Sequence, residues 1–561
     1  GSGNDDVSVA NTEVVNLGGG NDVAIATGDS AAHQTDVVKL SGTIETGDVY
    51  TVTVNATKAS YRVQDGDTIV EVQAGLIDLL NAGSSGNVVA TAGSTSDEVV
   101  IRAGRAGSQE EFQVNTYTSN NQVDPSITAL KDGSVVMIWT DQGGQDGSGH
   151  GVYGQRYDAS GKADGGEFRI NTVTNSTQEI PSAAALEDGG FVVTWYNGNN
   201  NDLRGQRFDG DGSMAGSEFK FGSQAGGSEL SVTGLKDGGF VVSWRSPTSQ
   251  DGSDYGVYAQ RYDVDGNAAG EEFLVNTVTD RSQQDPSIAA LEDGGFVIAW
   301  EGNYQDTSGS DYGIYAQRYE ASGNADGGEF RVNSHLEGSQ NNPSVTGLTD
   351  GGYVVTWQSD SQDGSSNGVY GQRYDKEGDP VGGEMHISTE TQYEQTMPDV
   401  TALLDGGFVV TWQSNYQDTS GSDYGVYGQR YDASGNTFGN EFQINTHTSS
   451  SQLDPSVTAL NDGGFVVAWE SEGQDGSSYG IYGQRFGIDG STDRFFTSVD
   501  AINNTGIGLN DAEVVVEELH AAQASLHQID EVKLSGSVTA GELYEIKVSD
   551  GENTHSVTYT A

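Results

Sequence analysis

The stretch Gly189-Gly-Phe-Val-Val-Thr-Trp195 decides the fold, because close variants of it recur along most of the chain. Each variant ends in a tryptophan, and the variants follow one another about every 55 residues, a period typical of repeat architectures. The closing tryptophans are Trp139, Trp195, Trp244, Trp300, Trp357, Trp412 and Trp469, which are all 7 in the chain. The sequence therefore contains seven copies of one unit.

Each unit contains four short segments of strand character, separated by Gly, Asp and Ser. In the last copy the first three are Asp454–Leu460, Gly463–Trp469 and Gly480–Phe486, and they are rich in Val, Tyr, Phe and Trp. The second segment is apolar on both faces, as expected for a sheet that packs between two others. Four strands in each of seven units predict an all-β protein with a seven-bladed β-propeller of four-stranded blades.

The phase of the repeat predicts how the ring closes. The fourth-strand sequence Glu110–Thr116 precedes the first complete unit, whereas the last unit loses the pattern after Phe486. A strand from the front of the chain would complete the last blade and remove exposed sheet edges. This offset favours a propeller over a linear β-solenoid, and we place the propeller at 110–496, closed by strand 110–116.

The composition restricts the classes of partner. The 561 residues include 25 Lys and Arg against 82 Asp and Glu, a net charge of -57. Such a surface repels nucleic acid and anionic lipid headgroups, so neither is an expected partner. No apolar run is long enough for a membrane span, and the absence of cysteine excludes disulfides and a thiol nucleophile. The acidic surface either suits saline surroundings or binds Ca²⁺ in part.

Two glycine-rich turns at the start of the chain, Gly1–Val9 and Gly18–Ile25, resemble the hemolysin-type (RTX) calcium-binding repeat. In that family the glycines permit tight turns, and Asp side chains and backbone carbonyls supply oxygen ligands. The resemblance implies that Asp5 and Asp22 bind Ca²⁺ within 1–32. Ordinary Gly-Asn-Asp turns are the alternative.

Residues 33–104 predict a small β-rich linker module with one short helix near 70–81, and residues 505–561 look like a partial second copy. His527–Gly536 mirrors His33–Gly42 almost residue for residue. Tandem modules with RTX-like turns and an acidic composition are similar to the large secreted surface proteins and adhesins of Gram-negative bacteria. That resemblance implies an extracellular or cell-surface location and a longer parent chain. It also implies that the partners are other copies of the same protein or cell-surface glycans.

Within the propeller, the second-to-third and fourth-to-first connections of every blade emerge on one side of the disc. We call this side the Gln-Asp face, because six of its second-to-third loops contain Gln-Asp, at Asp146, Asp251, Asp306, Asp363, Asp418 and Asp475. Two loops add a second acid five residues later, and the pairs Asp306/Asp311 and Asp418/Asp423 can ligate Ca²⁺ or form Asx turns. The Asp-Gly-Gly and Asp-x-x-Gly turns of the opposite face are ordinary turn chemistry.

The Gln-Asp face is also the predicted ligand-binding face. Its candidate residues are Asp251, Asp363, Asp475, Tyr255, Tyr312, Tyr424 and Tyr479. Aromatic rings with polar neighbours suit sugar rings, although tyrosines beside strands also serve in packing. A Gln-Arg pair recurs in the third strand of every unit, and we expect each arginine to pair with an acid of its own or the next blade.

No catalytic signature is evident. The His residues lack metal-binding spacing, and two Gly-x-Ser-x-Gly strings, at Gly364–Gly368 and Gly476–Gly480, lie in loops and not at strand-to-helix elbows. The sequence therefore predicts a protein that is not an enzyme, namely a structural scaffold or adhesin segment with calcium-stabilised loops. The alternatives are a lectin-like glycan-binding propeller and a polysaccharide-active enzyme.

Overall fold

The computed structural model describes residues 111–487, apart from 176, 199–201, 223–228, 247–251, 253, 304–311 and 418–422. It also describes 492–493, residues 63, 68 and 72, and a set of strands nearer the two ends of the chain. The chain divides into two compact units, 108–497 and 1–107 with 498–561, and each is described by itself.

Unit 108–497 is a seven-bladed propeller whose blades follow one another along the chain. The first four blades are β10 (Gln122–Ala129), β11 (Val135–Asp141), β12 (Gly151–Tyr157) and β13 (Phe168–Arg169); β14 (Gln178–Ala185), β15 (Phe191–Asn197), β16 (Asp202–Phe208) and β17 (Met214–Phe221); β18 (Leu230–Gly234), β19 (Phe240–Arg245), β20 (Val257–Tyr262) and β21 (Phe273–Leu274); β22 (Gln283–Ala290), β23 (Phe296–Asn303), β24 (Tyr312–Tyr319) and β25 (Ala325–Arg331).

The last three blades are β26 (Gln340–Gly347), β27 (Tyr353–Asp360), β28 (Asn367–Tyr374) and β29 (Pro380–His386); β30 (Gln395–Ala402), β31 (Phe408–Asn415), β32 (Tyr424–Tyr431) and β33 (Thr437–Gln443); β34 (Gln452–Ala459), β35 (Phe465–Glu472), β36 (Tyr479–Phe486) and β37 (Thr492–Asp493), to which β9 (Phe112–Gln113) adds. Successive strands of a blade pair side by side and antiparallel. The predicted fold is thereby confirmed.

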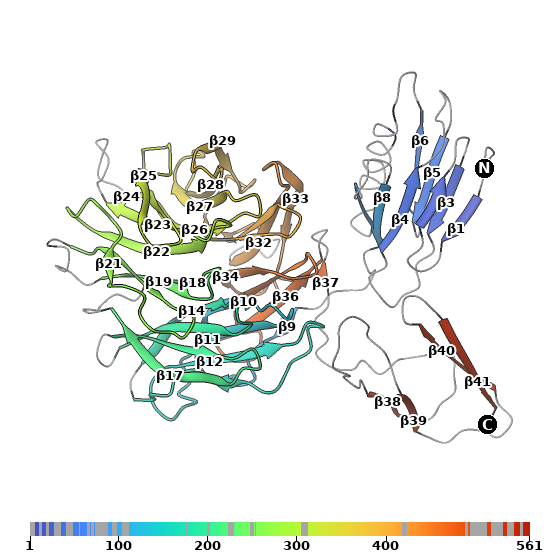
Figure 1. Ribbon diagram of the computed structural model, residues 1–561, viewed down its shortest axis with the longest axis horizontal. Helices are drawn as coiled ribbons and strands as arrows, with labels where there is room; N and C mark the ends of the chain where they lie inside the picture. The colour runs from blue at the N-terminus through green and yellow to red at the C-terminus, as the bar shows by residue number, and fades with distance from the viewer. Residues whose placement is uncertain are drawn as a thin grey trace. The chain divides into compact units, whose positions relative to one another are not determined.

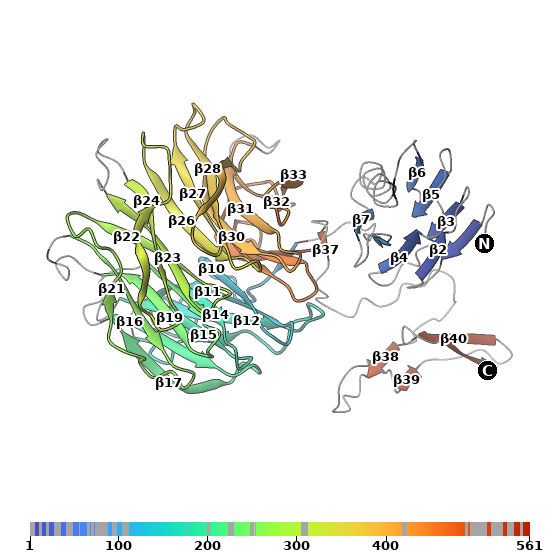
Figure 2. The same ribbon diagram turned by 45° about the horizontal axis from the view of Figure 1, so that its top comes forward.

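The first strand of each blade lies nearest the axis of the disc. In Figure 1, β10, β14, β18 and β34 surround the centre, while β17, β25, β29 and β33 lie toward the rim. Figure 2 shows the same arrangement with the disc tilted. First strands of neighbouring blades contact one another all round the ring, including β10 with β34.

The hydrophobic core lies between blades, because both faces of each blade are covered. Val136 and Ile138 of the first blade pack with Val193 and Trp195 of the second, and the other junctions repeat this arrangement. All seven tryptophans are fully buried. The Gly-Gly-Phe-Val-Val-Thr-Trp stretch therefore recurs because each copy is the second strand of a blade and supplies both interfaces.

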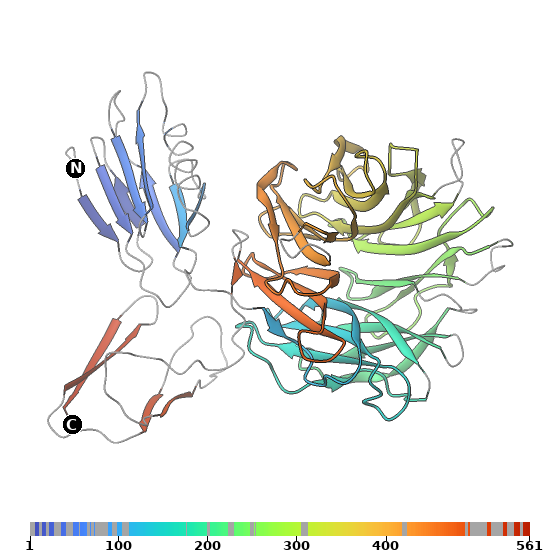
Figure 3. The ribbon, with the colours of Figure 1, turned by 180° about the vertical axis from the view of Figure 1, so that it is seen from behind.

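The ring closes through a fourth strand built from both ends of the propeller. In β36, Tyr482 and Gly483 pair with Gln113 and Phe112 of β9, while Arg485 and Phe486 pair with β37. In the sixth blade the single strand β33 makes both sets of pairs, with a register shift between them. The break between β9 and β37 falls at that shift. Figure 3 shows the blue strand from the front of the propeller beside the orange strands of the last blade.

A side-chain hydrogen bond that recurs between neighbouring blades is also formed where the ring closes. A strand-four glutamate accepts hydrogen bonds from the backbone N–H of a Thr or Ser in the preceding blade, at Thr116–Glu167, Thr172–Glu218, Thr277–Glu329, Ser334–Glu384, Thr389–Glu441 and Thr446–Glu111. In the last of these, Glu111 lies just before β9 and Thr446 belongs to the sixth blade. The front segment thus replaces the fourth strand of the last blade in its side-chain hydrogen bonds as well as in its backbone pairing.

The recurring arginines pair as expected. Each binds the Asp of the first-to-second turn in its own blade (Asp-Gly-Ser in the first blade, Asp-Gly-Gly in the others), in the pairs Arg156–Asp132, Arg207–Asp188, Arg261–Asp237, Arg318–Asp293, Arg373–Asp350, Arg430–Asp405 and Arg485–Asp462. The other oxygen of Asp188 accepts the N–H of Gly190 at 2.9 Å, as in an Asx turn. These aspartates therefore serve the structure of the turn.

The second unit is described through its strands. These are β1 (Asp6–Val9), β2 (Val14–Leu17), β3 (Asp22–Ala26), β4 (Thr35–Leu40), β5 (Val49–Val54), β6 (Thr57–Arg62), β7 (Val88–Ala92), β8 (Glu98–Ala103), β38 (Glu513–Glu517), β39 (Glu531–Ser535), β40 (Leu543–Ser549) and β41 (Thr554–Thr560). β1 and β5 flank β3 in one sheet and β2 pairs with β4 in another, all in parallel, so successive strands alternate between two sheets. Asp22 begins β3, whereas Asp5 lies outside the described residues. The helix predicted near 70–81 does so too, except for helical Val72.

Candidate ligand-binding face

The structure divides the predicted site residues into two groups. Asp251, Asp306, Asp311 and Asp418 lie outside the described residues. The others are Asp363, Asp423, Asp475, Tyr255, Tyr312, Tyr424 and Tyr479, and all of them are only partly exposed. Arg245 covers the ring of Tyr255 at 4.4 Å from its centroid, so that tyrosine contributes to packing.

An exposed aromatic pair, absent from the sequence-based set, lies on the same face. Tyr393 precedes β30 in a fourth-to-first loop, and Tyr416 follows β31 in a second-to-third loop. Their ring centroids are 4.9 Å apart with an interplanar angle of 38°. The two residues are 49% and 43% exposed, in contrast to the buried tyrosines of the strands. The fifth and sixth blades thus present two adjoining aromatic rings to solvent.

Both tyrosines have a left-handed backbone, with φ of 69° at Tyr393 and 59° at Tyr416. This conformation is costly for a residue with a large side chain. At the position of Tyr393 other blades have Asn120, Arg281, Gly338 or Ser450, and at that of Tyr416 they have Ser361 or Gly473, all with positive φ. The conformation thus recurs in these loops, but among the described residues only this junction places two aromatic side chains on it in contact.

Hydrogen bonds fix the floor beside the aromatic pair. The hydroxyl of Tyr424 donates to Oε2 of Glu394 at 2.6 Å, and the backbone N–H of Asn415 donates to the carbonyl of Glu394 at 2.9 Å. Burial and the Glu394 carboxylate raise the pKa of Tyr424 to about 12, so the phenol stays protonated. The bonds join the loops that carry Tyr393 and Tyr416. The predicted residue Tyr424 therefore positions the platform formed by the two exposed rings.

The inner strands bend at a residue before proline, close to the axis on the same face. In six blades a β-bulge places this residue in the left-handed region, at Asp124, Ile180, Asp285, Asn342, Met397 and Asp454. Its backbone N–H donates to a side chain of the preceding blade, in the pairs Asp124–Glu470, Ile180–Thr140, Asp285–Glu229, Asn342–Glu301, Met397–Gln358 and Asp454–Gln413. The strained residues therefore connect neighbouring blades.

Two pairs of these inner carboxyl groups lie in contact. Side-chain hydrogen bonds join Asp454 to Glu470 and Asp285 to Glu301. Burial raises the pKa of all four groups, and the negative charge of the partner raises it further at Glu470 and Asp285. Two carboxyl groups in such contact cannot both ionise easily, so each pair retains a proton at pH values where free carboxyls have lost theirs.

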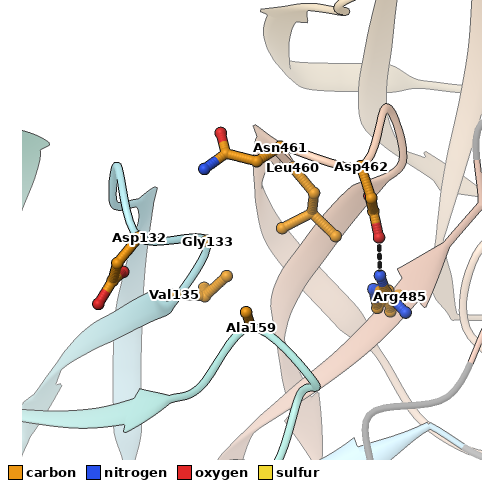
Figure 4. A pocket seen from close by; sticks show the side chains of 8 residues that line it. All are labelled: Asp132, Gly133, Val135, Ala159, Leu460, Asn461, Asp462 and Arg485. Carbon is orange, nitrogen blue, oxygen red and sulfur yellow. Dashed lines mark hydrogen bonds and ion pairs between the residues drawn. The ribbon is translucent and has the colours of Figure 1, made fainter. Parts of the chain in front are cut away.

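The opposite face contains a small cavity at the closure. It measures about 250 Å³ and lies between the first-to-second turns of the first and last blades. Figure 4 shows Arg485 paired with Asp462 on one side and Gly133 with Ala159 on the other. Across this junction, the Asn461 amide donates to the carbonyls of Leu130 and Lys131 at 3.2 and 3.1 Å. The cavity thus marks the seam where the two ends of the ring meet.

Over the described residues, no three or more His, Asp or Glu side chains are arranged as a metal cluster. In that same part of the chain, no helix is both long and apolar enough to cross a bilayer.

Comparisons with known proteins locate the fold but no family. No family model and no curated protein matches the chain. Among solved structures, the propeller domain of the Trilobed protease from Pyrococcus furiosus is 13% identical, with 69% of this chain and 99% of that chain covered and a TM-score of 0.42. The α-L-arabinanase of Penicillium chrysogenum is 15% identical, with coverages of 58% and 98% and a TM-score of 0.39. The NanB sialidase of Streptococcus pneumoniae is 12% identical, with coverages of 71% and 75% and a TM-score of 0.38. At these identities the likeness concerns the fold alone.

One sequence-based prediction needs correction. The sequence, which contains no catalytic signature, predicts a protein that is not an enzyme. The similar structures are mostly propeller glycoside hydrolases, including arabinofuranosidases from Lactobacillus brevis and Fusarium graminearum. The prediction was wrong.

Proposed function

We propose that the propeller binds a glycan on its Gln-Asp face, at the platform of Tyr393 and Tyr416. The observation that carries the proposal is the exposed pair of rings on left-handed backbone positions. Loop residues that retain a strained conformation and an exposed aromatic surface gain nothing for folding. Sugar rings combine apolar C–H faces with hydroxyl groups, and they match aromatic faces bordered by hydrogen-bonding groups.

The polar groups beside the platform suit such a ligand. Glu394, which follows Tyr393, offers a carboxylate, and the backbone carbonyl of Asp423 accepts a hydrogen bond from the N–H of Tyr416 at 3.3 Å. The strongly acidic chain disfavours polyanionic ligands, because a net charge of -57 repels them. Neutral glycans are therefore the first class to test. A role as a surface protein or adhesin is compatible with this proposal and would supply the setting for it.

The test compares wild-type protein with the variant Tyr393→Ala/Tyr416→Ala on a glycan array, followed by titration calorimetry with the best ligand. Loss of a stacked aromatic ring costs roughly 0.5–1.5 kcal/mol, so the double variant should bind about 5-fold to 150-fold more weakly. The matched control is Val264→Ala/Leu404→Ala, which removes exposed apolar side chains (46% and 58% exposed) from turns of the opposite face. Equal affinity of both variants would refute the platform.

Hydrolysis of the bound glycan is the second candidate function. The observation that favours it is the pair of proton-sharing carboxyl couples near the axis, because a carboxyl group with a raised pKa can act as a general acid near neutral pH. Incubation with neutral polysaccharides should then release reducing ends, and Glu301→Gln should reduce the release at least 100-fold. If the protein binds the glycan without hydrolysing it, glycan binding remains as the proposed function and hydrolysis is excluded.

A further inference from the structure

The Gln-Asp loops contain a recurring buried oxygen atom that lacks a hydrogen-bond donor. In the three loops whose aspartate is described, Oδ1 accepts the backbone N–H two residues later, from Ser148 and Ser365 at 3.0 Å and from Ser477 at 2.8 Å. The other oxygen, Oδ2 of Asp146, Asp363 or Asp475, is buried and has no hydrogen-bond partner among the described residues. The Asp363 side chain is only 2% exposed.

The chain makes room for this oxygen in all three blades. A Cβ atom on the glycine at or near the start of the third strand would come within 3.4 Å of Oδ2 at Gly151, 3.0 Å at Gly368 and 2.9 Å at Gly480. The loop side of the aspartate thus forms an Asx turn, while Oδ2 is directed inward against the strand. Since the same arrangement occurs three times, a chance side-chain placement is a poor explanation.

Potential donors near Oδ2 do not satisfy it. The phenols of Tyr153, Tyr370 and Tyr482, two residues after each glycine, lie near the loop Asp and the strand-four Glu, but their O–H groups donate no hydrogen bond to Oδ2. Oε1 of Gln362 and Oε1 of Glu167 are likewise buried without a partner in the described structure. The Gln362 amide N–H donates to Glu384, which directs the Gln362 oxygen away from that glutamate.

In the described part of the fifth blade, no positively charged side chain donates a hydrogen bond to Oδ2 of Asp363. Nε2 of His386 lies 3.9 Å from Oδ2 of Asp363, beyond hydrogen-bond distance. In the seventh blade the equivalent residue opposite the tyrosine is the uncharged Gln113, and in the first blade it is the exposed Arg169, which forms no ion pair with Asp146 in the described structure. Several oxygen acceptors without donors favour a cation over another protein group.

We propose that the Gln-Asp loops of the first, fifth and seventh blades each bind a hard cation, Ca²⁺, through the inward Oδ2 of Asp146, Asp363 and Asp475. Neutral oxygens of the loop, such as Oε1 of Gln362, complete the coordination. Because each site has one dedicated loop carboxylate and no three-acid cluster in the described residues, its affinity is low. Dissociation constants of 10⁻⁴–10⁻³ M, as in extracellular modules, are expected. In the seventh blade the ion lies beside the closing strand β9.

The test uses the full chain and the triple variant Asp146→Asn/Asp363→Asn/Asp475→Asn. Asparagine keeps the oxygen that forms the Asx turn and replaces Oδ2 with an N–H donor. The matched control is Asp158→Asn/Asp263→Asn/Asp432→Asn, which removes the same charge from turns of the opposite face where the carboxylates already accept backbone N–H groups. Calcium titration by calorimetry and melting curves in CaCl₂ against NaCl of equal ionic strength are the readouts.

We expect the triple variant to bind three fewer Ca²⁺ ions per chain than the wild type, and to lose much of the calcium-induced rise in Tm. The control variant should keep both. If the loop variant keeps the wild-type stoichiometry, the ions bind elsewhere and the proposal fails. If wild-type protein shows no calcium-specific shift at 10 mM, the inward oxygens are satisfied by ordered water only, which equally overturns it.

Discussion

The sharpest test of the ring closure is the substitution Asn115→Ala. Asn115 is 2% exposed, and its Oδ1 accepts the N–H of Ile481 at 2.7 Å. Its Nδ2 donates to the carbonyl of Tyr117 at 2.9 Å and to Oε1 of Gln122 at 3.1 Å. Alanine leaves the buried Ile481 amide without an acceptor, at a cost of about 1–3 kcal/mol, and two further bonds are worth about 0.5–1.5 kcal/mol each. The expected loss is therefore about 2–6 kcal/mol, against a total stability of about 5–15 kcal/mol.

The sixth blade supplies the control. Asn445 makes the equivalent bonds, accepting from Val426 at 2.7 Å and donating to the carbonyl of His447 at 2.7 Å. Its strand, β33, follows β32 directly in the chain, whereas β9 is joined to the last blade only by non-covalent contacts. Asn445→Ala should destabilise without opening the ring, while Asn115→Ala should also release β9.

Hydrogen exchange at Val114 and Ile481, together with limited proteolysis before residue 117, measures that release. Denaturant unfolding gives the free energies of both variants. Two results would contradict the idea that this strand holds the ring together. One is that Asn115→Ala lowers the free energy of unfolding by less than 1 kcal/mol. The other is that the amides of β9 exchange equally slowly in both variants.

Three further predictions concern strain, pH and calcium. At Tyr393 and Tyr416, glycine variants should be more stable than alanine variants by roughly 1 kcal/mol per site, since only glycine accepts the left-handed backbone freely, and equal melting curves would contradict the strain argument. Glu301→Gln/Glu470→Gln should be more stable than wild type at pH 8, because a raised folded-state pKa means that wild-type stability falls as pH rises from the unfolded value of 4.5 toward the folded value. Stability curves of wild type and this variant that stay parallel from pH 4 to pH 8 would exclude that linkage. If the RTX resemblance holds, adding Asp5→Ala/Asp22→Ala to the variant Asp146→Asn/Asp363→Asn/Asp475→Asn should remove the calcium-induced stabilisation that remains in it. Calorimetry that counts the same number of bound ions with and without Asp5→Ala/Asp22→Ala would disprove the resemblance.

The repeat made the propeller predictable, and the bulges show where prediction stopped. The period of the tryptophans and the position of Glu110–Thr116 specify blades and closure, because burial on both faces leaves little freedom. By contrast, nothing in the sequence predicts the left-handed bulge at Asp124, Asp285 and Asp454, which lie within β10, β22 and β34. A residue before proline prefers an extended backbone, so the left-handed bulge contradicts the local rule. Only the inter-blade hydrogen bond made by its N–H explains it.

The aromatic platform lies on the Gln-Asp face, which the sequence singles out, but its two residues are not among those that the sequence predicts. Tyr255, Tyr312, Tyr424 and Tyr479 lie in or near strand ends and are half-buried. Tyr393 and Tyr416 belong to the loops beyond those strands, and their contact depends on two segments that are distant in sequence. The available signal was comparative: an aromatic residue occupies both positions, where most of the aligned units have Gly, Ser or Asn.

Differences between nearly identical blades indicate how many ligands the disc binds. Bonds that join blades recur almost unchanged around the ring, whereas the left-handed loop positions vary. The fourth blade has the same loop sequence as the sixth, with Tyr304 in place of Tyr416, but it has Arg281 at the position of Tyr393. In the described structure, only the junction of the fifth and sixth blades has an aromatic residue at both positions. A sevenfold scaffold therefore presents a single platform, off the axis, and calorimetry should give one glycan per chain. A stoichiometry of several per chain would mean that half-buried tyrosines at the other strand ends bind sugar, and that the strained pair is not the determinant.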